Sequence, residues 1–279
     1  GGDHRRSAAF RAAITAALAD GATLSVDDDA HHAAGVALVG GGPGAADLIT
    51  VRGRRLLAEA DVVVADRLAP GALLDELGPQ VEVIDAAKVP YGRAMRQEKI
   101  NELLVDRAKA GKFVVRLKGG DPYVYGRGFE ELQACVDAGV PVTVVPGVTS
   151  PISAPALAGI PVTHRGVTHE VVIVSGHVAP DHPDSLTDWP ALARLRGTLV
   201  LMMAVQRLDV FAQALLDGGK AGDTPVALIE NASRDDQRLI RTDLAHAAET
   251  AEAENLIPPA IVVIGPVAGF TDAERAIAF

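Results

Sequence analysis

The chain has 279 residues, of which 48% are hydrophobic and 22% charged, and its formal net charge is -10. These values predict a globular protein of one or two domains. The negative charge argues against broad nucleic-acid binding, which depends on basic surface. Apolar runs fall short of the roughly 20 residues that a membrane span needs, and the N-terminus lacks a signal-peptide core, so we expect a cytoplasmic protein with no membrane partner.

Residues 1–35 differ in character from the rest of the chain. Phe10, Ile14 and Leu18 recur at helical spacing, and a polar, acidic stretch follows them. We interpret residues 1–35 as a helix and linker that remain from a preceding module. The adjacent His31 and His32 are more typical of solvated histidines than of a metal site.

From Val36 onward, short apolar runs alternate with helical stretches. The first series predicts strands at 36–39, 62–65, 81–86, 113–118 and 142–145, and helices at 47–60, 70–77, 97–110 and 129–138. Such alternation predicts a mostly parallel sheet that helices cover on both faces. A second series predicts strands at 170–175, 198–203, 225–230, 237–242 and 260–265, and helices around 208–216 and 244–252. With residues 159–166 as the hinge, the domains are 36–160 and 161–279.

The single cysteine of the chain, Cys135, lies in the predicted helix 129–138 beside Leu132 and Val136. One cysteine excludes an internal disulfide and a thiolate metal cluster. Its apolar neighbours indicate a packed helix residue. We therefore expect neither metal binding nor catalysis by this thiol.

The stretch from Arg116 to Gly128 is the most informative part of the chain. A predicted strand ends there on Gly119, Gly120 and Asp121, followed by further glycines and cations. Glycines let the backbone approach a ligand closely, and α/β proteins bind ligands at the carboxyl ends of their strands. The sequence therefore predicts a ligand-binding edge here.

A second glycine turn, Gly40 to Gly44, follows the first predicted strand. Its position is that of a dinucleotide-binding turn, but Pro43 removes an amide donor that a pyrophosphate would use. Asp66, next to Arg67, does not match an ordinary ribose site either. On spacing, a tight structural turn is as well supported as a ligand loop.

Charged side chains end two further strands of the first series. Asp66 and Lys88 suit a base and an acid if burial tunes their pKa values, but they also suit an ion pair with each other or with Arg67. All three tyrosines also fall on these loops, where they suit either stacking on a flat ligand or half-buried packing: Tyr91, Tyr123 and Tyr125.

Five segments together carry a family resemblance. They are Val-Gly-Gly-Gly-Pro-Gly at 39–44, Ala-Asp-Arg-Leu at 65–68, Leu-Lys-Gly-Gly-Asp-Pro-Tyr-Val-Tyr-Gly-Arg-Gly at 117–128, Val-Pro-Gly-Val-Thr-Ser at 145–150 and Ala-Gly-Ile-Pro-Val-Thr-His-Arg-Gly at 158–166. In this order they resemble the tetrapyrrole methylase family over about residues 36–270. More narrowly, they resemble its uroporphyrinogen-III C-methyltransferase branch, free-standing or as the C-terminal module of siroheme synthase.

The resemblance implies a fold and a set of roles. The fold is α/β, with two α/β domains of the tetrapyrrole methylase type and the active-site cleft between them. Asp66 matches the family's proposed proton acceptor and Lys88 its proposed donor. The positions implied for the cofactor S-adenosylmethionine are Pro43, Gly119, Gly120, Asp121, Val124, Thr149, Ser150, Met203 and Ala232. We expect Arg67, Arg127, His164 and Arg165 to bind substrate carboxylates, because guanidinium groups bind carboxylates bidentately.

The implied reaction is methylation of uroporphyrinogen III at C2 and then C7. It gives precorrin-2 for siroheme or cobalamin biosynthesis and releases S-adenosylhomocysteine. Two alternatives are another precorrin methyltransferase and a non-catalytic protein that binds S-adenosylmethionine or a tetrapyrrole. The family is usually homodimeric. Departures from its pattern at Ala45, Ala65 and Ala232 leave Asp66 and Lys88 in place.

Overall fold

The computed structural model describes residues 33–86 and 95–271. The chain divides into two compact units, Gly1–Thr149 and Ser150–Phe279, each of which is described below by itself. Most of the predicted helix and linker at 1–35 lies outside the described residues. Within 33–86 and 95–271, no helix is both long enough and apolar enough to cross a membrane.

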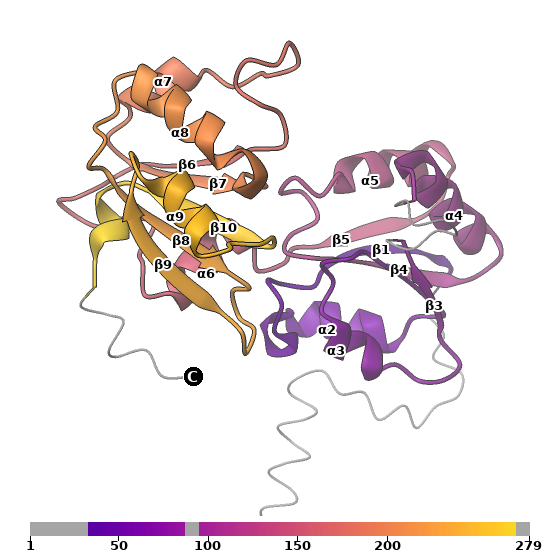
Figure 1. Ribbon diagram of the computed structural model, residues 1–279. Helices are drawn as coiled ribbons and strands as arrows, with labels where there is room; N and C mark the ends of the chain where they lie inside the picture. The colour runs from indigo at the N-terminus through magenta and orange to yellow at the C-terminus, as the bar shows by residue number, and fades with distance from the viewer. Residues whose placement is uncertain (1–32, 87–94, 272–279) are drawn as a thin grey trace, which may run out of the picture. The chain divides into compact units, whose positions relative to one another are not determined.

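The first unit is built on a five-stranded parallel sheet (Figure 1). Its strands are β1 (Gly35–Gly40), β2 (Val62–Ala65), β3 (Glu82–Asp85), β4 (Phe113–Lys118) and β5 (Val142–Val145), in the order β3-β2-β4-β1-β5. The three central strands β1, β2 and β4 are buried along their whole length, which explains their nearly continuous apolar sequences. The parallel sheet predicted from the first series is therefore confirmed.

Helices cover both faces of this sheet. They are η1 (Ala46–Leu48), α2 (Val51–Ala58), α3 (Gly71–Asp75), α4 (Gln97–Lys109) and α5 (Gly128–Asp137). In Figure 1, α2 and α3 lie on one side of the strands and α4 and α5 on the other, and each pair packs its own apolar cluster against the sheet. The helix predicted at 47–60 is confirmed over Val51–Ala58, but it is not continuous with the 3-10 turn that precedes it. The break lies at Thr50, which begins α2 by accepting a hydrogen bond from the Gly53 N–H at 3.1 Å.

The second unit contains a mixed five-stranded sheet. Its strands are β6 (Val171–Ser175), β7 (Thr198–Met202), β8 (Pro225–Glu230), β9 (Arg238–Asp243) and β10 (Ala260–Ile264), in the order β6-β7-β10-β8-β9. Only the β6–β7 pair of this sheet is parallel. Because β10 runs against both neighbours, its first residues lie level with the carboxyl ends of β7 and β8.

The helices of the second unit are α6 (Ser150–Leu157), α7 (Trp189–Arg194), η2 (Val205–Arg207), α8 (Leu208–Asp217), α9 (Ala247–Ala253) and η3 (Pro266–Gly269). Two apolar clusters lie on the two faces of the sheet, one with α7, α8 and α9 and the other with α6 and η3 (Figure 1). Helices α6 and α7 were not predicted from the sequence. The predicted hinge at 159–166 lies in this unit, where Ile160 is fully buried in the α6 cluster.

Candidate active site

Three glycine-rich loops meet at the carboxyl edge of the first sheet. Gly42 and Gly120 form an isolated antiparallel bridge, with N–H to C=O distances of 2.7 and 3.3 Å. A Cβ on Gly147 would lie 2.0 Å from the Gly120 carbonyl oxygen, and a Cβ on Gly40 would lie 2.5 Å from Gly147 Cα. The loops after β1, β4 and β5 therefore pack backbone against backbone, and only glycine allows this approach.

Asp121 ties two of these loops together. One oxygen of its carboxylate accepts the Gly147 N–H at 2.9 Å and the other accepts the Tyr123 N–H at 2.8 Å. The Asp121 carbonyl also accepts the Val124 N–H at 3.3 Å. The structure thus brings five predicted cofactor positions to one edge: Pro43, Gly119, Gly120, Asp121 and Val124. Direct contact of each with the cofactor stays a prediction.

Asp66 lies at the same edge, directly after β2. Its Oδ1 accepts the Leu68 N–H at 2.9 Å and the Gly119 N–H at 3.3 Å. A Cβ on Gly119 would lie 2.6 Å from Leu68 Cβ, so the loop after β2 packs tightly on the loop after β4. The proposed proton acceptor is therefore held in place by backbone N–H groups. Its predicted partner Lys88 lies outside the described residues, as does Tyr91.

A buried charge cluster that was not predicted from the sequence lies behind this edge. Glu131, which is fully buried, pairs with Arg116 Nε at 2.9 Å and with Lys118 Nζ at 3.1 Å. Gln97 adds a third hydrogen bond to Glu131 at 3.2 Å. Burial lowers the pKa of Lys118, helped by the Arg116 charge and opposed by the charges of Glu131 and Asp66. Arg116 and Lys118 are charged residues inside an otherwise apolar strand, and this was the sequence signal for a buried charge cluster.

Arg127, predicted to bind a substrate carboxylate, has a left-handed backbone with φ 57° and an exposed side chain. Its guanidinium group forms two hydrogen bonds to Glu130, at 2.7 and 2.8 Å. This pairing raises the pKa of Arg127 and lowers the pKa of Glu130. A substrate carboxylate would therefore compete with Glu130 for this arginine. Arg67, at the end of β2, is also exposed.

Exposed aromatic residues lie close to Arg127 in the sequence. Tyr123 and Phe129 make an edge-to-face contact with ring centroids 6.2 Å apart, and Tyr125 is also exposed. Tyr123 and Tyr125 are 49% and 47% exposed, so both the stacking and the half-buried packing alternatives stay open. Exposed rings and a guanidinium group on one loop suit a flat, carboxylated ligand.

The remaining predicted cofactor positions lie where the first unit ends and the second begins in the sequence, and within the second unit. Thr149 is the last residue of the first unit, and Ser150 begins α6. Met203 follows β7 with φ 55° and an exposed side chain, and Ala232 follows β8. The intervening β10 brings their loops to one sheet edge, where the Asn231 N–H donates to the Pro259 carbonyl at 3.0 Å.

His164 and Arg165 lie on an exposed turn of the second unit. The turn is closed by hydrogen bonds between the backbones of His164 and Thr168, at 2.9 and 3.2 Å. The His164 ring contacts Phe270 edge to face at 5.2 Å, and its Nδ1 lies 2.9 Å from the Arg165 carbonyl oxygen. These contacts fix the histidine and leave the Arg165 side chain exposed.

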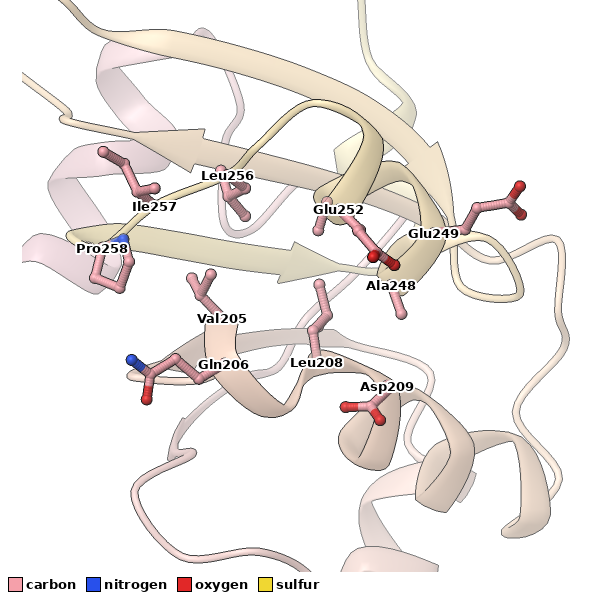
Figure 2. A pocket seen from close by; sticks show the side chains of 11 residues that line it. Val205, Gln206, Leu208, Asp209, Ala248, Glu249, Glu252, Leu256, Ile257 and Pro258 are labelled. Atoms are coloured by element: carbon pink, nitrogen blue, oxygen red, sulfur yellow. The ribbon is translucent and has the colours of Figure 1, made fainter.

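The second unit also contains a pocket of about 670 Å³ between η2, α8, α9 and the loop before β10 (Figure 2). Val205, Leu208 and Leu256 give it apolar walls, and the carboxylates of Asp209 and Glu252 lie beside them. None of the predicted site residues lines this pocket. Among the described residues, no group of three or more histidine, cysteine, aspartate or glutamate side chains is arranged to hold a metal ion.

Glycine loops closed on one another, with a fixed carboxylate beside them, define the first unit as an α/β ligand-binding unit of the kind found in cofactor-dependent enzymes. The chain belongs to the family of Tetrapyrrole (Corrin/Porphyrin) Methylases, whose family model matches residues 35–248. The family resemblance and the α/β fold predicted from the sequence are thus confirmed.

Three relatives illustrate this membership. The chain is 47% identical over 237 residues to the S-adenosyl-L-methionine-dependent uroporphyrinogen III methyltransferase of Methanosarcina barkeri, covering 85% of this chain and 93% of that protein. It is 44% identical over 238 residues to siroheme synthase 1 of Yersinia pseudotuberculosis, covering 85% of this chain but 50% of that protein. A Thermus thermophilus uroporphyrin-III C-methyl transferase complexed with S-adenyl homocysteine has a similar structure, with a TM-score of 0.72, 38% identity, and coverage of 87% of this chain and 99% of that chain.

Proposed function

We propose that this chain is an S-adenosylmethionine-dependent methyltransferase that methylates uroporphyrinogen III at C2 and then C7, giving precorrin-2. The observation that carries this proposal is the 47% identity to the Methanosarcina barkeri enzyme, which extends over nearly the whole length of that protein. The similar Thermus thermophilus structure with S-adenyl homocysteine supports the choice of cofactor.

The residues present fit this cofactor. The glycine loops after β1, β4 and β5 pack closely, and Asp121 and its hydrogen-bond partners fix the loop at Gly119 and Gly120. Exposed Met203 offers an apolar thioether surface in the second unit. When bound, S-adenosylmethionine supplies an activated methyl group on its sulfonium. The protein's main task is then to align donor and acceptor, which removes entropy from the barrier.

Asp66 is the residue that accepts the proton from the methylated ring. Two backbone N–H groups orient its carboxylate, so little reorganisation is needed when charge develops nearby. We retain Lys88 as the proton donor on the family resemblance. Arg67, Arg127, His164 and Arg165 are proposed to bind the eight substrate carboxylates, and the exposed tyrosines Tyr123 and Tyr125 to contact the flat ring system.

We further propose that the chain acts in the cytoplasm as a homodimer that binds neither nucleic acid nor membrane. The net charge of -10 supports the absence of a nucleic-acid partner. The dimer rests on the family resemblance, and analytical ultracentrifugation of the whole chain tests it.

The decisive experiment is anaerobic incubation with S-adenosylmethionine and freshly reduced uroporphyrinogen III, followed by mass spectrometry. We expect a product that has gained two methyl groups and two molecules of S-adenosylhomocysteine per substrate. Turnover only with an already methylated precorrin would favour another precorrin methyltransferase. Binding without formation of S-adenosylhomocysteine would make the chain a non-catalytic binding protein.

A further inference from the structure

The buried cluster behind the candidate active site contains more positive than negative charge. The side chains of Arg116, Lys118 and Glu131 are 4%, 3% and 0% exposed, so one carboxylate faces two cations. Arg116 also donates to the Val64 and Leu117 carbonyls, at 3.1 and 3.3 Å. Arg116 therefore has three hydrogen-bond acceptors, whereas Lys118 shares the Glu131 carboxylate with it and makes up the surplus charge.

Burying this surplus charge costs stability. The loss of water around the ammonium group is the main reason that the pKa of Lys118 is lowered, and the Arg116 charge acts in the same direction. A neutral side chain of the same length would leave the Arg116–Glu131 pair intact. The contact between Arg116 Nε and Glu131 at 2.9 Å therefore does not depend on the Lys118 charge.

The position of Lys118 connects it to Asp66. Ala65 of β2 lies in register with Leu117 of β4, so Asp66 and Lys118 are the next residues of two paired strands. The Asp66 N–H donates to the Leu117 carbonyl at 3.2 Å, and the Asp66 carboxylate accepts from the Gly119 N–H. The two residues whose backbones bond to Asp66, Leu117 and Gly119, are therefore the chain neighbours of Lys118 on either side.

We propose that Lys118 is a positioning residue for the proposed proton acceptor Asp66. Its buried positive charge, held in place by Glu131, attracts the Asp66 carboxylate and so favours the orientation in which that carboxylate accepts the Gly119 N–H. The inference rests on the proposed function. It assigns the surplus cation to catalysis rather than to stability.

The test compares Lys118→Met with the wild-type chain, and uses Lys112→Met as the matched control because Lys112 is an exposed lysine just before the same strand. Three quantities are measured: the thermal unfolding midpoint, the Kd for S-adenosylhomocysteine, and kcat and KM with uroporphyrinogen III. For Lys118→Met we expect an equal or higher midpoint, a Kd within threefold of wild type, and a kcat lowered on the order of 10- to 100-fold. The control should match wild type in all three.

Each other outcome overturns the inference. A midpoint lowered by more than about 8 °C, or a chain that does not fold, would make Lys118 a structural residue. A Kd that rises in parallel with the loss of kcat would mean that Lys118 supports the cofactor loop instead of Asp66. A kcat within threefold of wild type would leave Lys118 with no catalytic effect. A wild-type chain that binds S-adenosylhomocysteine but transfers no methyl group would instead contradict the proposed function, and the inference with it.

Discussion

The Asp121 carboxylate accepts the Gly147 N–H at 2.9 Å and so joins the loop after β4 to the loop after β5. The same carboxylate accepts the Tyr123 N–H within its own loop. Hydrogen bonds to an ionised acceptor are the stronger kind. Asp121 is therefore an organising residue of the glycine edge, whatever contact it makes with the cofactor.

Asp121→Ala removes both of these hydrogen bonds. We expect the free energy of unfolding to fall by about 1.5–3 kcal/mol and the Kd for S-adenosylhomocysteine to rise about 10-fold or more, because the two loops separate. Urea denaturation and isothermal titration calorimetry measure these effects. Asp137→Ala is the control, since Asp137 pairs with Gln133 on the exposed side of α5. Wild-type affinity in Asp121→Ala would contradict the organising role.

Gly147→Ala tests the close packing of the loops. The new Cβ would lie 2.0 Å from the Gly120 carbonyl oxygen, so the loops must move apart at a cost of about 1–3 kcal/mol of stability. Weaker S-adenosylhomocysteine binding should accompany this loss. Gly71→Ala is the matched control, because a Cβ there meets nothing within 4 Å and alanine favours the helix. Equal melting temperatures for the two variants would show that the glycine contact does not restrain the loops.

Asp66→Asn tests the proposed proton acceptor. The amide keeps an oxygen that can accept the Leu68 and Gly119 N–H groups but cannot take up the proton. We expect kcat to fall by about 10²–10⁴-fold while the Kd for S-adenosylhomocysteine stays near wild type. Asp61→Asn, at the other end of β2, is the control, because its carboxylate also accepts a backbone N–H, from Phe113 at 2.8 Å. If both variants kept full turnover, the role assigned to Asp66 would be wrong.

Substitutions of Arg127 and of Glu130 are expected to change the KM for uroporphyrinogen III in opposite directions. Arg127→Ala should raise the KM for uroporphyrinogen III about 10-fold, because one carboxylate loses a charged partner. Glu130→Ala removes the competing carboxylate, so the KM should fall by up to about fivefold. Steady-state kinetics measures both values. Parallel changes in the two variants would show that the ion pair acts only on the shape of the loop.

The Cys135 thiol should be unreactive in the folded protein. It is fully buried, and burial raises its pKa to about 11, so almost no thiolate is present at pH 8. We expect no alkylation by iodoacetamide at pH 8 in native buffer and complete alkylation in guanidinium chloride, measured by intact mass. Rapid native alkylation would mean that α5 opens from the sheet.

The strands of the first unit could be predicted because strands that are buried on both faces have mostly apolar sequences. Val62–Ala65 and Phe113–Lys118 are covered on both faces and are therefore nearly continuous apolar runs. The missed helices have weaker patterns: α6 contains Pro151 and Pro155, and α7 is only six residues long. The antiparallel pairing of β10 could not be predicted, because pairing direction depends on contacts between strands distant in sequence.

The α/β class and the glycine-rich edge at Gly119 to Asp121 could be predicted from the sequence alone, because they depend on local patterns of burial and backbone freedom. The family could be predicted because its motifs occur in this chain in the same order. Only the tertiary structure showed that Asp121 bonds to Gly147, that Asp66 is held by the Gly119 N–H, and that Lys118 shares Glu131 with Arg116. Each of these contacts joins different loops, strands or helices of the first unit, at separations from 13 to 53 residues along the chain. Which residues meet depends on how the sheet places strand ends beside one another. No single segment of the sequence determines that arrangement.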